Sequence, residues 1–259
     1  MNGPESRPLL QVDDVTLRFG GVTALSGVGF EVAAGEICGL VGPNGAGKTS
    51  LFNCVSGYYR PSAGRIRVSG RDVLAAPPHR MVDLGIARTF QQPALQADRS
   101  VLDNVLLGGH SKLTGNALAY LLALPMTRRQ ERALNGRARA LIDYLGLSGV
   151  EGTPAGDLPY GSQKRVEIAR ALLSEPRLLM LDEPAGGLAH GEVDELGALI
   201  RRIRDDRDVT VIVVEHHMGL IAGITDHVVA LVTGTKVSEG TARQVQSDPV
   251  VVSAYLGAA

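Results

Sequence analysis

A glycine-rich segment that ends in a lysine and a hydroxyl residue is the first part of the sequence whose spacing could do chemistry. Residues 42–49 fit the pattern G-x-x-x-x-G-K-[ST], between an apolar run at 37–41 and a segment with helical spacing at 50–56. Glycines let successive backbone N–H groups surround a phosphate, and the helix N-terminus adds positive potential. The lysine would reach the outer phosphates of a nucleotide, and the hydroxyl would bind Mg²⁺. The pattern predicts a nucleotide site formed by Gly42, Pro43, Asn44, Gly45, Ala46, Gly47, Lys48, Thr49 and Ser50.

Two adjacent carboxylates, Asp182 and Glu183, follow the apolar run at 178–181. Beside a phosphate-binding loop, Asp182 would hold Mg²⁺ directly or through water, and Glu183 would polarise the water that attacks the γ-phosphate. A simpler alternative makes Glu183 a neighbour of a helix N-cap. Taken together, the loop and the carboxylates predict nucleotide hydrolysis.

Composition and charge limit the class of protein. The 26 basic and 27 acidic residues nearly cancel, so the chain lacks the electrostatic footprint of a dedicated nucleic-acid binder. Two cysteines are too few for a disulfide scaffold, which favours a reduced, cytosolic protein. Because no apolar run approaches the roughly 18 residues that span a bilayer and the start lacks signal-peptide features, we expect membrane association only through a partner.

Periodicity indicates an α/β protein in which these motifs are placed at strand ends. Strands are expected at residues 9–19, 28–32, 37–41, 65–68, 178–181, 209–214 and 230–237. Helices are expected at residues 50–56, 116–124, 128–144, 161–174, 192–204 and 242–256. The first strands mix antiparallel pairs with the start of an α/β core, and the helical pattern over 101–147 indicates an inserted helical subdomain.

The segment Leu158-Pro159-Tyr160-Gly161-Ser162-Gln163-Lys164-Arg165, which opens a helix before Asp182, resembles the signature of the ATP-binding cassette family, Leu-Ser-Gly-Gly-Gln. Further similarities follow in the family's order. Phe19 looks like the aromatic residue that stacks on adenine, Gln91 like the Q-loop glutamine, and His216 like the switch histidine. Within the family, residues 85–91, the Tyr-Gly pair, Glu215-His216 and the ending at 254–257 are most similar to the ATPase subunits of branched-chain amino acid importers.

This resemblance implies a P-loop NTPase fold of the cassette type, with a mixed sheet in a RecA-like α/β core, an antiparallel β subdomain and an inserted helical subdomain. It implies one nucleotide-binding domain over residues 1–259, a helical subdomain with the signature over 96–175, and a C-terminal helix over 240–259. By the same resemblance, Glu183, His216, Gln91 and Lys48 are catalytic, Thr49, Gln91 and Asp182 bind the metal, and Gly161, Ser162 and Gln163 bind nucleotide.

The resemblance also implies the cofactors and partners. ATP and Mg²⁺ would bind, and the chain would work with integral membrane permease subunits, a second ATPase chain and, indirectly, a substrate-binding protein, without nucleic acid. It would lie in the cytoplasm, peripherally on the inner face of the cell membrane. Its function would be to hydrolyse ATP and so power uptake of a small polar substrate, such as branched-chain or other amino acids.

Four positions depart from the family pattern. Pro159 stands where the signature has serine, Tyr160 where it has its first glycine, Ser162 where it has glutamine, and Ala189 where many members have the D-loop aspartate; the subfamily resemblance tolerates Tyr160. Proline has neither an N–H nor a hydroxyl, so it cannot donate to a γ-phosphate. In a head-to-tail pair of ATPase domains, each signature completes the nucleotide site on the other domain's phosphate loop. A homodimer of this chain would therefore have two weakened sites. The departures favour a heterodimer that hydrolyses ATP mainly at this chain's own phosphate loop.

Two other functions stay open at the level of sequence. One is a soluble ATPase of the same superfamily that acts on nucleic acid or the ribosome, although such proteins usually carry a long coiled-coil insert or two cassettes. The other is a regulatory subunit that binds ATP without hydrolysis. The intact catalytic and metal-binding residues argue against it, namely Lys48, Asp182, Glu183 and His216. A guanine-nucleotide switch is disfavoured because the sequence has no Asn-Lys-x-Asp motif.

Overall fold

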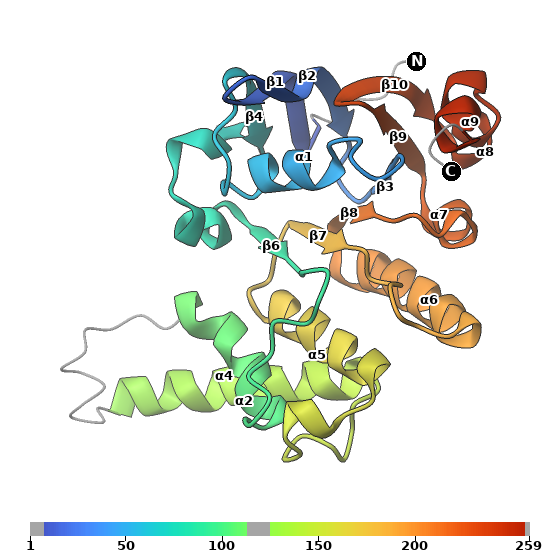
Figure 1. Ribbon diagram of the computed structural model, residues 1–259. Coiled ribbons are helices and arrows are strands. Elements are labelled where there is room, and N and C mark those ends of the chain that lie inside the picture. The colour runs from blue at the N-terminus through green and yellow to red at the C-terminus, as the bar shows by residue number, and fades with distance from the viewer. Residues whose placement is uncertain (1–7, 113–124, 257–259) are drawn as a thin grey trace, which may run out of the picture. The chain divides into compact units, whose positions relative to one another are not determined.

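The computed structural model describes residues 8–112 and 125–256 and forms two compact units (Figure 1). The first unit combines the described residues up to Arg88 with those from Arg177 onward, and the second runs from Thr89 to Pro176. The helix predicted at 116–124 lies outside the described residues.

An antiparallel sheet with the strand order β2-β1-β4-β5 forms one layer of the first unit. Its strands are β1 (Leu10–Phe19), β2 (Val22–Val32), β4 (Ala63–Val68) and β5 (Arg71–Asp72). Val12 and Val15 of β1 are both buried although they are three residues apart, because the ladder is irregular between them and Asp14 adopts a positive φ of 49°. β2 begins earlier than the strand predicted at 28–32, since it pairs with β1 from Val22 onward.

A mixed sheet with the order β10-β9-β3-β8-β7-β6 forms the second layer of this unit. Its strands are β3 (Ile37–Val41), β6 (Ile86–Arg88), β7 (Leu178–Asp182), β8 (Thr210–Val214), β9 (His227–Val232) and β10 (Thr235–Gly240). All neighbours are parallel except β9 and β10. Every residue of β3, β7 and β8 is buried, which explains why these strands, apart from Asp182 and Thr210 at their ends, are continuously apolar rather than alternating.

The helices of the first unit are α1 (Lys48–Val55), α6 (His190–Arg207), α7 (Met218–Ile224), α8 (Ala242–Gln246) and α9 (Pro249–Leu256), with 3₁₀ turns η1 (Val73–Ala75) and η2 (Pro78–Leu84). Leu51 and Phe52 of α1 are almost wholly buried in one apolar cluster with residues of both sheets, such as Ile66 and Leu40. Burial of these side chains therefore fixes α1 between the two layers.

The carboxyl ends of three adjacent parallel strands carry the sequence motifs. β3 leads into the phosphate-loop residues 42–49, β7 ends at Asp182, and β8 is followed by Glu215 and His216. In open α/β sheets, ligands bind outside this edge.

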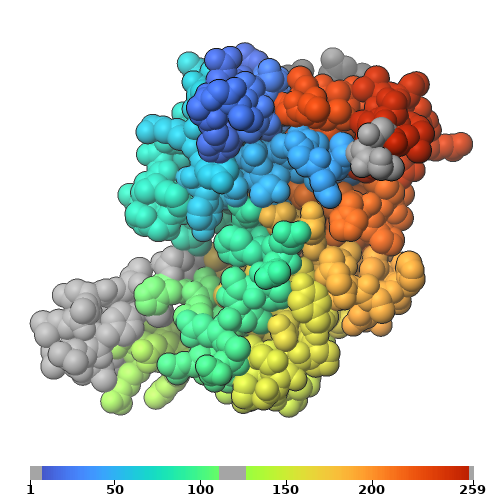
Figure 2. Space-filling model, in the orientation of Figure 1, coloured from blue at the N-terminus to red at the C-terminus, as the bar shows by residue number. Residues whose placement is uncertain are grey.

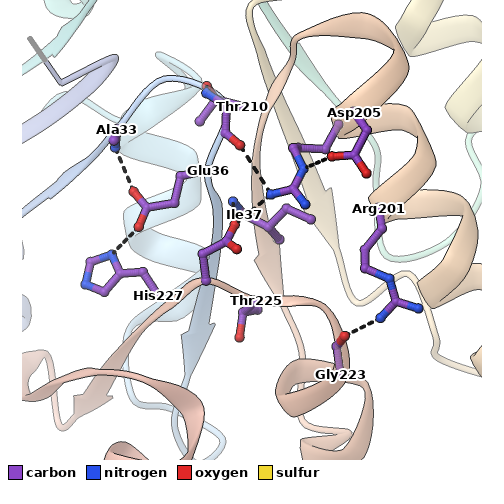
Figure 3. A network of polar contacts seen from close by, with 12 residues as sticks. Ala33, Glu36, Ile37, Arg201, Asp205, Thr210, Gly223, Thr225 and His227 are labelled. Carbon is purple, nitrogen blue, oxygen red and sulfur yellow. Dashed lines mark hydrogen bonds and ion pairs between the residues drawn. The ribbon is translucent and has the colours of Figure 1, made fainter. Parts of the chain in front are cut away.

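Polar contacts join the amino ends of β3 and β9, at the opposite edge of the sheet (Figure 3). Glu36 accepts a hydrogen bond from the Ala33 N–H (2.8 Å), and its other oxygen lies 3.8 Å from Nδ1 of His227. Asp226 accepts from the Ile37 N–H (2.9 Å), which ties the start of β3 to the start of β9.

The second unit is helical. Its helices are α2 (Val101–Leu106), α4 (Pro125–Tyr144) and α5 (Tyr160–Leu173), with 3₁₀ turns η3 (Leu107–Lys112) and η4 (Ala155–Asp157). The helices predicted at 128–144 and 161–174 are confirmed within a few residues, and Val166 and Ala169 on the predicted apolar face of α5 are fully buried.

Two predictions about the end of the chain are wrong. The strand predicted at 230–237 is the hairpin of β9 and β10, because Thr233 (φ 45°) and Gly234 (φ 80°) form a tight turn inside a run of strand-forming residues. The single helix predicted at 242–256 is two helices, α8 and α9. Pro249 disfavours helical backbone at the preceding residue and starts a new helix instead.

Candidate nucleotide site

A cavity of about 420 Å³ lies at the N-terminus of α1. It is lined by Val22, Thr23, Ala24, Asn44, Gly45, Ala46, Gly47, Lys48, Thr49, Ser50, Glu183 and Thr233. The first backbone N–H groups of a helix have no carbonyl partner within the helix, so those at the start of α1 are suited to an anion. The structure therefore brings together in one cavity most of the loop residues predicted from the sequence and one predicted catalytic carboxylate.

Glycine is required at two loop positions. Gly42 has a φ of 147°, and a Cβ there would lie 2.1 Å from the Leu231 carbonyl oxygen. Gly47, the N-cap of α1, has a φ of 99°, and its Cβ would lie 2.9 Å from the Ala24 carbonyl oxygen. The loop can take this path only because neither residue has a side chain.

The Lys48 ammonium is held inside the loop. Its Nζ donates to the carbonyl oxygens of Gly42 (2.6 Å) and Pro43 (3.0 Å), and the residue is buried. Burial lowers the pKa of Lys48, whereas the carboxylates of Glu183 and Asp182 act in the opposite direction. The loop, the lysine and the two acids thus belong to one electrostatic environment.

Asp182, the last residue of β7, is held by an arginine that sequence reasoning did not single out. Its Oδ2 lies 2.7 Å from Arg88 at the end of β6, and both side chains are about nine-tenths buried. The same guanidinium donates to Asn53 Oδ1 (2.6 Å) and Ser56 Oγ (2.9 Å) on and just after α1. Arg88 therefore connects the aspartate to the phosphate-loop helix. Its signal in the sequence is its position three residues before Gln91.

Glu183 leaves the strand in an unusual backbone conformation. It has a φ of 45°, and its N–H still donates to the Val214 carbonyl (2.9 Å) in line with the β7–β8 ladder. Left-handed backbone is rare for residues with side chains and marks positions that the surrounding structure enforces. Here the turn follows the ladder directly, and the half-buried carboxylate lines the cavity.

Glu215 anchors the loop that carries His216. This carboxylate is fully buried, and it accepts from the backbone N–H groups of Ala185 (2.7 Å), His216 (3.0 Å) and His217 (3.2 Å). The His216 side chain is 64% exposed, lies outside the set that lines the cavity, and has its Nδ1 3.8 Å from Glu215. His217 instead caps α7, where its Nδ1 accepts from the Leu220 N–H (3.1 Å). Glu215 was noted in the sequence only as part of a similar string, without a role.

Phe19 ends β1 with its ring about half exposed. It makes an edge-to-face contact with Tyr59, with ring centroids 5.1 Å apart, and it does not belong to the cavity lining. Tyr59 was not predicted, because nothing in its local sequence marks an aromatic pair. The assignment of Phe19 to adenine stays a prediction.

The remaining predicted residues lie in the second unit. Lys164 of α5 donates to the Gln91 carbonyl oxygen (2.7 Å), and Glu167, one turn later, accepts from the Phe90 N–H (3.1 Å). Burial raises the pKa of Glu167, while that N–H and Arg170 oppose the shift. Within this unit, the signature helix therefore holds the glutamine loop through buried polar side chains.

The signature residues form the first turn of α5. Pro159 is the N-cap, its carbonyl accepts from the N–H groups of Ser162 (2.9 Å) and Gln163 (3.1 Å), and no side chain caps the helix. The Gln163 amide donates to the Leu158 carbonyl (2.9 Å), and Gly161 and Ser162 are half-buried. The polar donor that a serine would supply at position 159 is absent from the sequence itself.

Across the described residues 8–112 and 125–256, no helix combines the length and apolar character needed to cross a membrane.

Comparison with known proteins gives matches along the chain. The family model described as ABC transporter matches residues 25–186, and the one described as branched-chain amino acid ATP-binding cassette transporter matches residues 235–259. The chain is 42% identical to the high-affinity branched-chain amino acid transport ATP-binding protein BraF of Pseudomonas aeruginosa, over 98% of this chain and 100% of that protein. It is 39% identical, over the same shares, to the protein LivG of Escherichia coli, which bears the same description.

Solved structures agree with these relatives. The ADP conformation of an ATP-binding cassette of an ABC transporter superposes with a TM-score of 0.84 at 30% identity, covering 96% of this chain and 99% of that one. A nucleotide-free ATP-binding cassette from an ABC transporter gives 0.83 at 29% identity, with coverage of 96% and 98%. The fold expected from the sequence is confirmed, and the chain belongs to the ABC transporter family as an ATPase cassette of the branched-chain amino acid transport type.

Proposed function

We propose that this chain binds and hydrolyses ATP to power the uptake of branched-chain or related amino acids through a membrane importer. In that role it works peripherally at the inner face of the cell membrane, with integral permease subunits, a second ATPase chain and, indirectly, a substrate-binding protein. The observation that carries the proposal is the cavity at α1, where Lys48, Thr49 and Glu183 face the same space.

The phosphates of ATP fit the charge and donors of this cavity. The start of α1 presents backbone N–H groups and the positive end of the helix, and Lys48 supplies a full positive charge. On binding, the Lys48 ammonium would exchange its bonds to the loop carbonyls for bonds to phosphate oxygens. The two carbonyl bonds keep it within the loop until that exchange.

The donor set also fits Mg²⁺. Thr49 offers a hydroxyl to the cavity, and Asp182 offers a carboxylate at the end of β7, and these oxygen ligands are of the kind that Mg²⁺ prefers. When bound, the ion would neutralise charge on the β- and γ-phosphates. The contribution of Gln91, in the second unit, stays a prediction from the resemblance.

Glu183 is the residue we assign to the attacking water. Its carboxylate lines the cavity that holds the phosphate loop, and its backbone is fixed by the bond to Val214. It would orient the water and accept its proton as the water attacks the γ-phosphate. His216, held by Glu215 through its backbone, would approach the γ-phosphate from the end of β8.

The experiment is transport by the assembled complex. The chain is co-purified from membranes with its partners, reconstituted into vesicles with the binding protein, and tested for ATP-driven uptake of leucine, isoleucine and valine. Glu183→Gln should lower ATP turnover about a hundredfold or more and abolish uptake, while a fluorescent ATP analogue still binds. Glu192→Gln, an exposed carboxylate on α6, is the matched control and should behave as wild type.

Two results would reject the proposal. One is ATP turnover without uptake of any amino acid by a complex that contains the permease subunits. The other is recovery of the chain only in soluble fractions with nucleic acid.

A further inference from the structure

The C-terminal helix α9 contacts the phosphate loop directly. The N–H of Gly42, the first residue of the loop, donates to the hydroxyl oxygen of Tyr255 at 3.0 Å. The two residues are separated by 213 positions in the sequence. Figure 2 shows the red C-terminal residues on the same face of the first unit as the light-blue residues around the loop.

Gly42 needs a partner outside the sheet. Val41 is the last residue of β3 that pairs with β9, and Gly42 then turns away with a φ of 147°. The Tyr255 hydroxyl takes the place of the next ladder acceptor. Because a backbone N–H without a partner is costly when shielded from water, this bond stabilises the path of the loop.

The same peptide segment reaches the catalytic lysine. The Gly42 carbonyl accepts from Lys48 Nζ (2.6 Å), while its N–H binds Tyr255. Gly42 is therefore fixed from both sides, on one by the C-terminal helix and on the other by the lysine. A change in the position of Gly42 would move a carbonyl that holds Lys48.

The Tyr255 hydroxyl is suited to this role, and α9 packs against β9, β10 and α8. Burial raises the pKa of the Tyr255 phenol, while the bond from the Gly42 N–H opposes the shift, and a neutral hydroxyl can accept that bond through an oxygen lone pair. Among the described side chains of α9, Val251 is buried, whereas Val250, Val252 and Leu256 are exposed. The hydroxyl of Tyr255 thus adds a directed bond to the phosphate loop to the packing of α9 on the sheet.

We propose that Tyr255 is a positioning residue of the nucleotide site: its hydroxyl holds the Gly42 peptide, and α9 thereby sets the affinity for ATP. This inference rests on the proposed use of the loop to bind ATP. It assigns to the C-terminal helix α9 the role of holding the first peptide of the phosphate loop in place.

The test compares Tyr255→Phe with wild type in the full-length chain within its complex. Loss of one hydrogen bond should raise the KM for ATP and the Kd of a fluorescent ATP analogue about two- to tenfold, and kcat should change less than twofold. Without nucleotide, amide exchange in the loop peptide that contains Gly42 should become faster by a similar factor. Leu256→Ala, an exposed change on the same helix, is the control and should alter neither quantity.

The amide-exchange measurement tests the role of Tyr255 separately from the proposed ATP-binding function of the loop. If no variant binds ATP but Tyr255→Phe still loosens the loop, the nucleotide function fails and the contact stands. An unchanged KM and unchanged exchange in Tyr255→Phe would overturn the role given to Tyr255, as would a loss of thermal stability without either effect.

Discussion

At the residue scale, the buried ion pair of Arg88 and Asp182 constrains the carboxyl end of β7. A buried pair stabilises little compared with apolar packing, but removal of one partner leaves a charge shielded from water. The guanidinium also binds Asn53 and Ser56, so its loss would loosen α1 as well as β7.

We therefore expect Arg88→Met to lower the free energy of unfolding by about 3 kcal/mol, measured by urea denaturation. The double variant with Asp182→Asn should regain part of the loss, because the unpaired charge is then gone. Arg80→Met breaks an exposed pair with Asp83 and should cost less than about 1 kcal/mol. Equal losses in the buried and exposed cases would contradict this account.

Glu215 allows a second prediction at this scale. Its carboxylate joins three N–H groups in two loops, those of Ala185 and of His216 and His217. Glu215→Gln has the same size but one acceptor oxygen, so one loop must lose its anchor. We expect kcat for ATP to fall more than tenfold with KM within about threefold, since the phosphate loop is untouched. The control Glu239→Gln, at an exposed position, should leave kcat and KM unchanged. If Glu215→Gln changed KM as much as kcat, the role of Glu215 as an anchor of the two loops would be refuted.

Residues that act through local spacing could be predicted from the sequence, and residues that act through distant partners could not. Lys48 and Thr49 stand at fixed offsets from glycines, so a pattern finds them. Arg88 acts through a residue 94 positions away and Tyr255 through one 213 positions away. Neither pairing leaves a periodic signal in a single sequence.

At the scale of elements, the phosphate loop depends on the close approach of β9. Gly42→Ala would place a methyl group 2.1 Å from the Leu231 carbonyl oxygen, and backbone of both β9 and the loop would have to move. We expect a loss of at least about 2 kcal/mol in stability, measured by thermal unfolding, and a large fall in affinity for an ATP analogue.

Gly191→Ala is the matched control, because this glycine lies in α6 with open space around its Cα. There, alanine should stabilise the protein by about 0.5–1 kcal/mol. Tolerance of alanine at Gly42 would show that β9 does not limit the loop.

Secondary structure was predictable where burial dictates composition. The wholly buried strands β3, β7 and β8 were found because their positions form continuous apolar runs, with polar residues only at Asp182 and Thr210. The turn between β9 and β10 was missed because Thr233 reads as a strand residue, and only the positive φ of Thr233 and Gly234 reveals it. β6 was missed because three residues are too short for a periodic pattern.

At the scale of the whole molecule, we propose that Pro159 makes the two nucleotide sites of a heterodimer unequal. If each signature completes the site on its partner's loop, the signature with Pro159 weakens the site on the partner's loop. The site on this chain's own loop is completed by the partner's signature. In a complex with a second ATPase chain of full signature, Glu183→Gln should remove most turnover, and the corresponding change in the partner should cost less. Equal losses would contradict the asymmetry.

The complementary experiment restores the signature. In a complex that already carries Glu183→Gln, adding Pro159→Ser and Ser162→Gln should raise the residual turnover about tenfold, because a hydroxyl and an amide can again donate to phosphate. The same pair of changes at an unrelated exposed turn should have no effect. A purified homodimer of the chain should turn over slowly and gain from the same restoration.

The first unit is built from two chain segments separated by residues 89–176, so its strands are synthesised at different times. β3 lies between β8 and β9, which follow the entire second unit in the chain. On the ribosome, β3 therefore emerges long before its neighbouring strands β8 and β9, while residues 89–176 are contiguous and can collapse as soon as they are synthesised. Until translation passes β9, β3 has no neighbouring strand on either side, whereas α1 can already pack against β4, which is made soon after it. We therefore expect the newly made N-terminal part to expose the unpaired edges of β3 until residues 210–232 have been synthesised.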